Sequence, residues 1–301
     1  MISYSPKEWF SFVFRIHKSE TFQQLIPLLF GVAIFAAIVA FLEIEFLSSN
    51  KKMIELVKGI STIYTLLGFT LSLLLTFRSN SAYDRWWEGR KQWGELTNCS
   101  RTFASHMNAI LGEKHIEERQ IVSDYLRIYA YTLQRHLKSE KVQREEFETF
   151  IKTDHLKAET IEFASAKHQP LAIYSSLVNF VQSLFASGKL NSQEIYHFKT
   201  ELHALMNVCG ACERIKNTPI PFSYSVFLKK FIFFYVMLFP LVYCVHMSYF
   251  IIPVTVFILY VLASIELIAE EIEDPFNGEA NDLPTEEMAE NIGKNVSEIL
   301  R

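Results

Sequence analysis

The stretch Gly59–Phe77 reads GISTIYTLLGFTLSLLLTF and contains no charged residue. At about 1.5 Å per residue, a helix of this length crosses the ~30 Å hydrocarbon core of a bilayer once. Two other stretches also lack Asp, Glu, Lys and Arg. Leu25–Leu42 is long enough for one crossing, whereas Phe231–Ile265 is too long for one and nearly long enough for two. The sequence therefore predicts a membrane protein rather than a purely soluble domain.

The uncharged stretches divide the chain into five predicted segments. The most polar point of Phe231–Ile265 is His246–Tyr249, so we expect a tight hairpin there, four transmembrane helices in total, and kinks at Pro240 and Pro253. The segments are an N-terminal segment (1–24), the first two spans (25–77), a cytoplasmic helical region (78–230), the last two spans (231–265) and a C-terminal segment (266–301).

The central segment is too long for a linker and has helical periodicity. Its clearest predicted helices are Ser81–Leu111, Ile116–Leu137, Pro170–Ala186 and Ser192–Ile215. No alternation typical of β-strands occurs, so we predict an all-α membrane protein whose cytoplasmic helices continue the membrane bundle.

The positions of basic residues predict the orientation of the chain in the membrane. Positive charges follow the second span and precede the third, at Arg78, Arg85, Arg90, Lys91, Lys229 and Lys230, whereas the predicted hairpin has none. The loop Glu43–Lys58 carries three lysines, which weakly favours the opposite orientation. The balance predicts both termini and the central segment in the cytoplasm. The aromatic segment Lys7–Phe14 is expected to lie on the bilayer surface.

The charge balance and the cysteines exclude several classes of protein. The chain carries 29 basic and 33 acidic residues, a net charge of −4, without a block of basic residues. Nucleic acid is therefore not expected as a partner. Four cysteines in a chain of 301 residues do not form the disulfide framework of a secreted protein.

No group of residues indicates catalysis or a resident metal. Cys209-Gly-Ala-Cys212 has CxxC spacing, but no second CxxC or close pair of histidines completes a zinc site. We predict that these thiols pack in the interior. The nine histidines are scattered, and no HExxH or HxxxH pattern occurs. We expect no enzyme, no cofactor and no metal site.

The second span has an apolar stripe. Phe69, Leu73 and Phe77 lie at i, i+4 and i+8, on one face of a helix. Such a stripe is common in the core of a bundle. If copies of the helix surround an axis, the same stripe forms a stack of apolar rings, which can gate ion flow by dewetting. The spacing alone does not choose between these interpretations.

Acidic residues end the last span, and two of them, Glu266 and Glu270, share a helix face. One interpretation is a solvated helix end. The other is a ring that attracts cations, if several subunits surround an axis.

Three longer motifs carry a family resemblance. The segment Phe77–Gly94 reads FRSNSAYDRWWEGRKQWG. It resembles the segment after the second transmembrane helix in bestrophins, particularly the bacterial branch. The segments Cys212–Tyr224, CERIKNTPIPFSY, and Glu273–Leu283, EDPFNGEANDL, agree with it. The resemblance covers nearly the whole chain in the same order.

The resemblance implies a homopentamer with one axial pore that passes small monovalent ions passively through the cytoplasmic (inner) membrane of a bacterium. By position, the hydrophobic neck would be Phe69, Leu73 and Phe77, and a lower aperture would lie at Gln193 with Ile195 as its neighbour. The expected partners are other copies of the chain, the lipid bilayer and the permeating ions.

Two family properties do not transfer directly. Animal members are calcium-regulated through an acidic cluster after the Pro-Phe-Gly motif, and here only Glu279 and Asp282 are acidic, so we do not expect calcium gating of that type. Animal members resemble anion channels, whereas the bacterial branch includes cation-selective ones. The acidic residues and the net charge of −4 slightly favour a cation such as Na⁺, with chloride as the alternative.

The sequence leaves two alternatives to a channel function. A membrane-anchored sensor or scaffold is supported by the long soluble segment, but it does not explain the hydroxyl-rich second span. A secondary transporter would need broken helices and charges at the midplane, and the uncharged spans argue against it.

Overall fold

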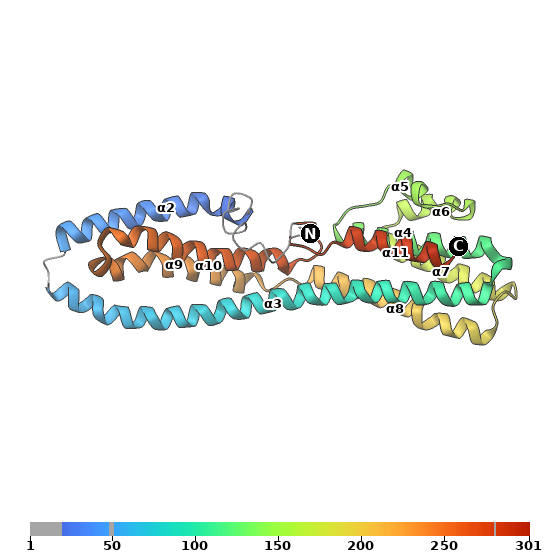
Figure 1. Cartoon of the computed structure of the whole chain (residues 1–301), viewed down its shortest axis with the longest axis horizontal. Helices are drawn as coiled ribbons and strands as arrows, with labels where there is room; N and C mark the ends of the chain where they lie inside the picture. Colours follow the sequence, from blue (N-terminus) through green and yellow to red (C-terminus); the bar gives the residue numbers. More distant parts are fainter. Residues whose placement is uncertain (1–19, 48–50, 280) are drawn as a thin grey trace. The chain divides into compact units, whose positions relative to one another are not determined.

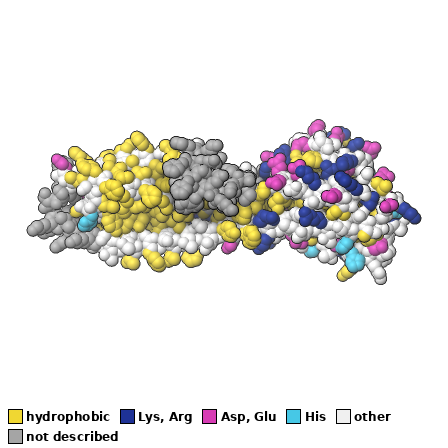
Figure 2. Space-filling view, in the orientation of Figure 1, with side chains coloured by type: hydrophobic (Ala, Val, Ile, Leu, Met, Phe, Trp, Pro, Cys, Tyr) yellow, Lys and Arg dark blue, Asp and Glu magenta, His cyan; other side chains and the backbone are white. Residues whose placement is uncertain are grey.

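The computed structural model describes residues 20–47, 51–279 and 281–301, and every regular element within these ranges is helical (Figure 1). The predicted surface segment Lys7–Phe14 lies outside them. The described chain groups into two compact units. We call residues 20–84 and 219–273 the apolar unit, and residues 85–218 and 274–301 the polar unit. Side chains on the apolar unit are mainly hydrophobic, and those on the polar unit are rich in charge (Figure 2).

The apolar unit is a helical bundle. Its helices are α2 (Glu20–Leu42, followed by the π-helical turn Glu43–Leu47), the first part of α3 (Lys51–Leu111), α9 (Phe222–Met247) and α10 (Ile251–Glu273). Among the described residues, three stretches are long and apolar enough to cross a membrane: Phe22–Glu45, Gly59–Leu111 and Phe222–Glu273. The outer faces keep large apolar side chains exposed, such as Phe30 on α2 and Phe257 on α10. A surface of this size and polarity fits lipid better than water.

The third apolar stretch is interrupted where its sequence is most polar. Helix α9 ends at Met247, a 3₁₀ turn covers Ser248–Phe250, and α10 begins at Ile251. The break overlaps the region predicted for the hairpin, His246–Tyr249, and extends one residue past it. Pro240 is inside α9 as expected. The predicted kink at Pro253 is wrong, because Pro253 is the third residue of α10, where the backbone N–H has no partner within the helix.

Helix α3 packs against the other helices of the apolar unit through one face only. Leu71 and Leu75 are buried against residues of α2, α9 and α10. Nearer the start of the helix, the Tyr64 ring stacks on Tyr235 with ring centroids 4.2 Å apart, and its hydroxyl donates to the Tyr235 carbonyl at 3.2 Å. A Cβ at Gly68 would lie 2.4 Å from the Tyr235 hydroxyl, so a larger residue here would have to displace the Tyr235 side chain.

The polar unit has a core built around α4. Its helices are the rest of α3, α4 (Ile116–Leu137), α5 (Arg144–Phe150), α6 (Asp154–Ser165), α7 (Gln169–Ala186), α8 (Ser192–Asn217) and α11 (Thr285–Ile299). Helix α4 contacts most of the others. The largest buried side chains include Trp93, Phe103, Tyr125 and Phe198. The Tyr129 hydroxyl donates to the Leu205 carbonyl at 2.7 Å, so this buried polar group is satisfied.

The four helices predicted for the central segment are present, with three differences. The predicted helix Ser81–Leu111 is continuous with the second span as α3, α7 begins one residue earlier at Gln169, and α8 continues to Asn217. The units divide after Asp84, Thr218 and Glu273, so the apolar unit extends outside the predicted spans, whose borders are Phe77, Phe231 and Ile265. Charged side chains just outside those borders pair inside the apolar unit, Arg78 with Glu266 and Lys229 with Glu270.

The CxxC cysteines pack in the interior, which confirms the prediction. Cys209 and Cys212 are fully buried and reduced. Burial raises the pKa of the Cys209 thiol to about 12, and it raises the pKa of the Cys212 thiol further. Both thiols therefore stay protonated and behave as small apolar side chains.

Candidate functional site

The predicted stripe lies on the open face of α3. The exposed fractions are 66% for Phe69, 44% for Leu73 and 62% for Phe77. The interpretation of this stripe as core of the chain's own bundle is therefore wrong. The face of α3 that does pack within the bundle carries Tyr64, Leu71 and Leu75 instead. Three large apolar side chains thus stand in a row on a helix that is apolar enough to cross a membrane.

Three threonines of the second span satisfy their hydroxyl donors within the helix. The side chains of Thr65, Thr70 and Thr76 each donate to the carbonyl four residues earlier, at 2.9–3.0 Å. A hydroxyl bonded in this way does not need a partner from another helix. These threonines can therefore stand on a surface next to lipid, another helix or water without an unpaired donor.

A groove of about 770 Å³ runs beside the stripe within the apolar unit. Its walls come from α3, with Thr65, Ser72 and Thr76, and from α9 and α10, with Phe239 and Val261 among their residues. The groove is mainly apolar. It leaves a concave face of the bundle uncovered by the described part of the chain.

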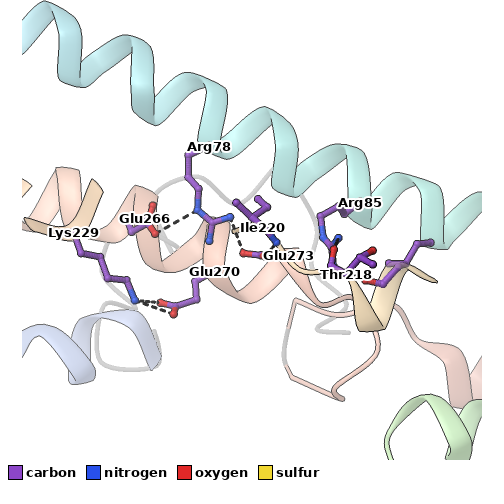
Figure 3. A network of polar contacts seen from close by, with 9 residues as sticks. Arg78, Arg85, Thr218, Ile220, Lys229, Glu266, Glu270 and Glu273 are labelled. Atoms are coloured by element: carbon purple, nitrogen blue, oxygen red, sulfur yellow. Dashed lines mark hydrogen bonds and ion pairs between the residues drawn. The ribbon is translucent and has the colours of Figure 1, made fainter. Parts of the chain in front are cut away.

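A buried arginine follows the stripe directly. Arg78 is only 1% exposed, and it lies between two carboxylates of α10 (Figure 3). Its Nε is 3.3 Å from Glu266 Oε1, and its guanidinium also pairs with Glu273 at 2.7 Å. The second oxygen of Glu273 accepts the backbone N–H of Ile220 at 2.6 Å. The residue after Phe77 therefore fixes α3 to α10.

The acidic end of α10 is not solvated throughout, contrary to one of the two interpretations drawn from the sequence. Glu266 is 2% exposed, so the solvated helix end is wrong for this residue, because its charge is needed beside Arg78. Glu270 has a side chain 50% exposed and pairs with Lys229 at 2.8 Å. The cation-attracting ring of Glu266 and Glu270 stays a prediction, and Glu270 is its accessible member.

The three motifs that carry the family resemblance meet in the polar unit. The Arg85 guanidinium donates to the carbonyls of Ile215 and Thr218, at the end of α8 (Figure 3). The Trp86 indole N–H donates to the Asn281 carbonyl at 3.1 Å. Segments more than one hundred residues apart are thus joined through one helical turn of α3. The motif residues in this unit have a structural role that explains why they occur together.

Gly89, in the first of these motifs, is needed for close packing. A Cβ at this position would lie 3.1 Å from the Phe276 ring, 3.2 Å from Leu283 and 3.2 Å from Pro275. Contacts this short require the neighbours to move by a few tenths of an ångström. An alanine fits at that cost, which its better helix propensity offsets, but a branched side chain does not.

We expect Gly89→Val to destabilise the polar unit by about 1–3 kcal/mol through overpacking. Gly210→Val is the matched control, because a Cβ at Gly210 of α8 meets no atom within 4 Å. Thermal unfolding of the detergent-solubilised variants measures the difference. Equal melting temperatures for the two variants would contradict the packing described here.

The loop after Pro275-Phe276 uses one of its acidic residues to close a turn. Asp282 is buried, and its carboxylate accepts the backbone N–H groups of Gly278 at 2.7 Å and of Glu279 at 2.9 Å. Gly278 has φ +93°, which glycine adopts without steric cost. Asp282 therefore has a structural role, and the expected lack of calcium gating of the animal type stays a prediction.

The residues predicted for a lower aperture lie in the first turn of α8. Asn191 caps this helix by accepting the N–H groups of Gln193 and Glu194. Gln193 is exposed, whereas Ile195 is half-buried against the core of the polar unit. Their role as an aperture stays a prediction, with Gln193 the more accessible of the two.

One cluster of potential metal ligands was missed at the sequence level. His136, His168 and Glu213 come from the end of α4, the residue before α7 and the last turns of α8, and their ligand atoms all lie within 4.8 Å of one another. Because the partners are separated by 45 and 77 residues, no spacing rule could have found them.

Comparison with known proteins identifies the family. A family model described as bacterial/fungal bestrophin protein matches residues 1–298. The chain belongs to the bestrophin family. This bestrophin is 31% identical over 232 residues to a protein of Nostoc sp. named as voltage-dependent anion channel-forming, covering 76% of this chain and 74% of the relative.

Further comparisons agree with this membership. A Ralstonia nicotianae protein of the same descriptive name is 31% identical over 243 residues, covering 80% of this chain and 77% of the relative. The crystal structure of a bacterial bestrophin homologue from Klebsiella pneumoniae matches with a TM-score of 0.80 at 24% identity. That match covers 92% of this chain and 98% of the other, and it shows that the fold is shared.

Proposed function

We propose that this bestrophin forms a homopentameric channel with one axial pore, which conducts small monovalent ions passively across the bacterial inner membrane. The observation that carries this proposal is the exposed apolar stripe Phe69, Leu73 and Phe77 on a helix long and apolar enough to span a bilayer. Family membership and the names of the relatives favour a channel over an enzyme.

Five copies of the stripe around an axis give three successive apolar rings. An ion passing such a constriction cannot replace its hydration shell with polar ligands, so an apolar neck closes to ions when it dewets. Widening or wetting of the neck opens the path. The buried pairs of Arg78 hold the end of the stripe against α10, which gives the neck a fixed base.

The topology proposed with this function has four spans, formed by α2, the first part of α3, α9 and α10, with both termini in the cytoplasm. The uncovered apolar groove beside the stripe supports association with other copies of the chain. A scaffold or sensor gives no reason for the exposed stripe. A secondary transporter needs charged residues near the membrane midplane. The proposed spans lack them, because residues 25–42, 59–77 and 231–265 contain no Asp, Glu, Lys or Arg.

A small anion is the permeant ion that we propose first, by analogy with the names of the relatives. A monovalent cation such as Na⁺ is the second candidate, favoured by the net charge of −4. The support from acidic residues is weaker than the sequence indicated, because Arg78 pairs with Glu266 and Lys229 pairs with Glu270. An apolar neck does not by itself select the sign of the ion.

The test is reconstitution of the purified full chain in planar bilayers under a gradient of NaCl. We expect discrete single-channel currents, with a reversal potential near the equilibrium potential of chloride. A reversal potential near that of Na⁺ would favour the cation candidate. Absence of currents from protein that is folded and inserted would contradict the channel proposal.

A further inference from the structure

A second site lies in the polar unit, where two imidazoles and one carboxylate converge. His136 is in the last turn of α4, His168 is the residue before α7, and Glu213 lies near the end of α8. The cluster therefore joins three helices of this unit. It is separate from the residues used for the proposed channel.

The two imidazoles point at the same oxygen atom. His136 Nε2 and His168 Nε2 are each 2.7 Å from Glu213 Oε1. The two rings lie against each other, with centroids 4.6 Å apart and an angle of 32° between their planes. The three side chains are 27–32% exposed, so an ion in solution can reach them.

This arrangement has the chemistry of a metal site. Two histidine nitrogens and one carboxylate oxygen, with water in the remaining positions, form a common ligand set for Zn²⁺. Nitrogen ligands favour first-row transition metals, whereas Ca²⁺ and Mg²⁺ prefer sites built from oxygen. We propose that His136, His168 and Glu213 bind a divalent transition-metal ion of the Zn²⁺ class, which links α4, α7 and α8.

Only a small movement is needed to admit the ion. Ligand atoms bonded at about 2.0–2.1 Å to a tetrahedral ion lie roughly 3.3 Å apart. The two nitrogens must therefore move away from the Glu213 oxygen by about 0.6 Å, which a rotation of the carboxylate provides.

The proton of the His168 imidazole limits the affinity for the metal ion. The backbone N–H of Leu171 donates to His168 Nδ1 at 3.1 Å, which places the proton of the neutral ring on Nε2. A metal at Nε2 requires that proton to move to Nδ1, where it faces the Leu171 N–H. Binding therefore competes with the N-cap of α7, and we expect weaker binding than in a site whose only role is to hold zinc.

Titration of the metal-free full chain in detergent with Zn²⁺, in competition with a chromophoric chelator, tests this proposal. We expect one Zn²⁺ per chain, and a loss of affinity of about tenfold or more in H136Q, H168N and E213Q, because each removes one of three protein ligands. Asparagine is a preferred N-cap, so H168N removes the ligand and keeps the cap of α7. Co²⁺ should give the visible absorption of a site with nitrogen ligands, and the same variants should lose it.

The controls distinguish this site from incidental binding. His203 is exposed on α8 outside the cluster, so H203N should bind Zn²⁺ as the parent chain does. C209S/C212S should also retain the affinity, because both thiols are buried and protonated. The proposal is overturned if the chain binds no Zn²⁺, if the three cluster variants bind as tightly as the parent, or if only the cysteine variant loses the ion.

Discussion

Arg78→Met is expected to destabilise the apolar unit by about 3–5 kcal/mol, the usual cost of removing one partner of a buried ion pair. Arg78 is 1% exposed, and its loss leaves the Glu266 carboxylate buried without a counter-charge. Glu273 loses the same partner but keeps its bond to the Ile220 N–H. Thermal unfolding in detergent, followed by tryptophan fluorescence, measures the change.

Two further variants make this result specific. R78M/E266Q/E273Q removes the charges together, so most of the lost stability should return, because a buried pair often contributes little compared with its neutral replacement. Arg101 is exposed on the same helix, and R101M should change the free energy of unfolding by no more than about 0.5 kcal/mol. If R78M behaves like R101M, the buried network does not hold α3 to α10.

The second large effect concerns conduction. Replacing Phe69, Leu73 and Phe77 together by alanine should raise the open probability at least about tenfold, which corresponds to a shift of about 1.4 kcal/mol in the free-energy difference between the closed and open states. The physical reason is that smaller side chains widen the proposed apolar rings, so that water stays in the neck. Single-channel recording in planar bilayers measures both open probability and conductance.

Helix α2 offers a matched control for this triple variant. Phe30, Ile34 and Ile38 have the same i, i+4, i+8 spacing and are likewise exposed on the apolar unit. Their replacement by alanine removes similar apolar surface from a face that we assign to lipid, so gating should not change. Equal effects of the two triple variants, or no effect of either, would contradict a neck formed by α3.

Local features of the polar unit could be predicted only in part. The helices with strong periodicity were found, whereas α5, α6 and α11 were not. Helix α5 has only seven residues, too short for a periodic signal. Helix α11 did carry a signal, because its buried residues Ala289, Ile292 and Val296 lie at i, i+3 and i+7.

The sequence by itself determined the membrane class, the family and the common face of Phe69, Leu73 and Phe77. These follow from runs of apolar residues, long motifs and the fixed geometry of the α-helix, which depend on neighbours along the chain. Only the tertiary structure decided that this face is open, that Glu266 is buried beside Arg78, and that His168 meets Glu213. The physical reason is that exposure and pairing depend on which distant helices pack together, and Arg78 and Glu266 are 188 residues apart in the sequence.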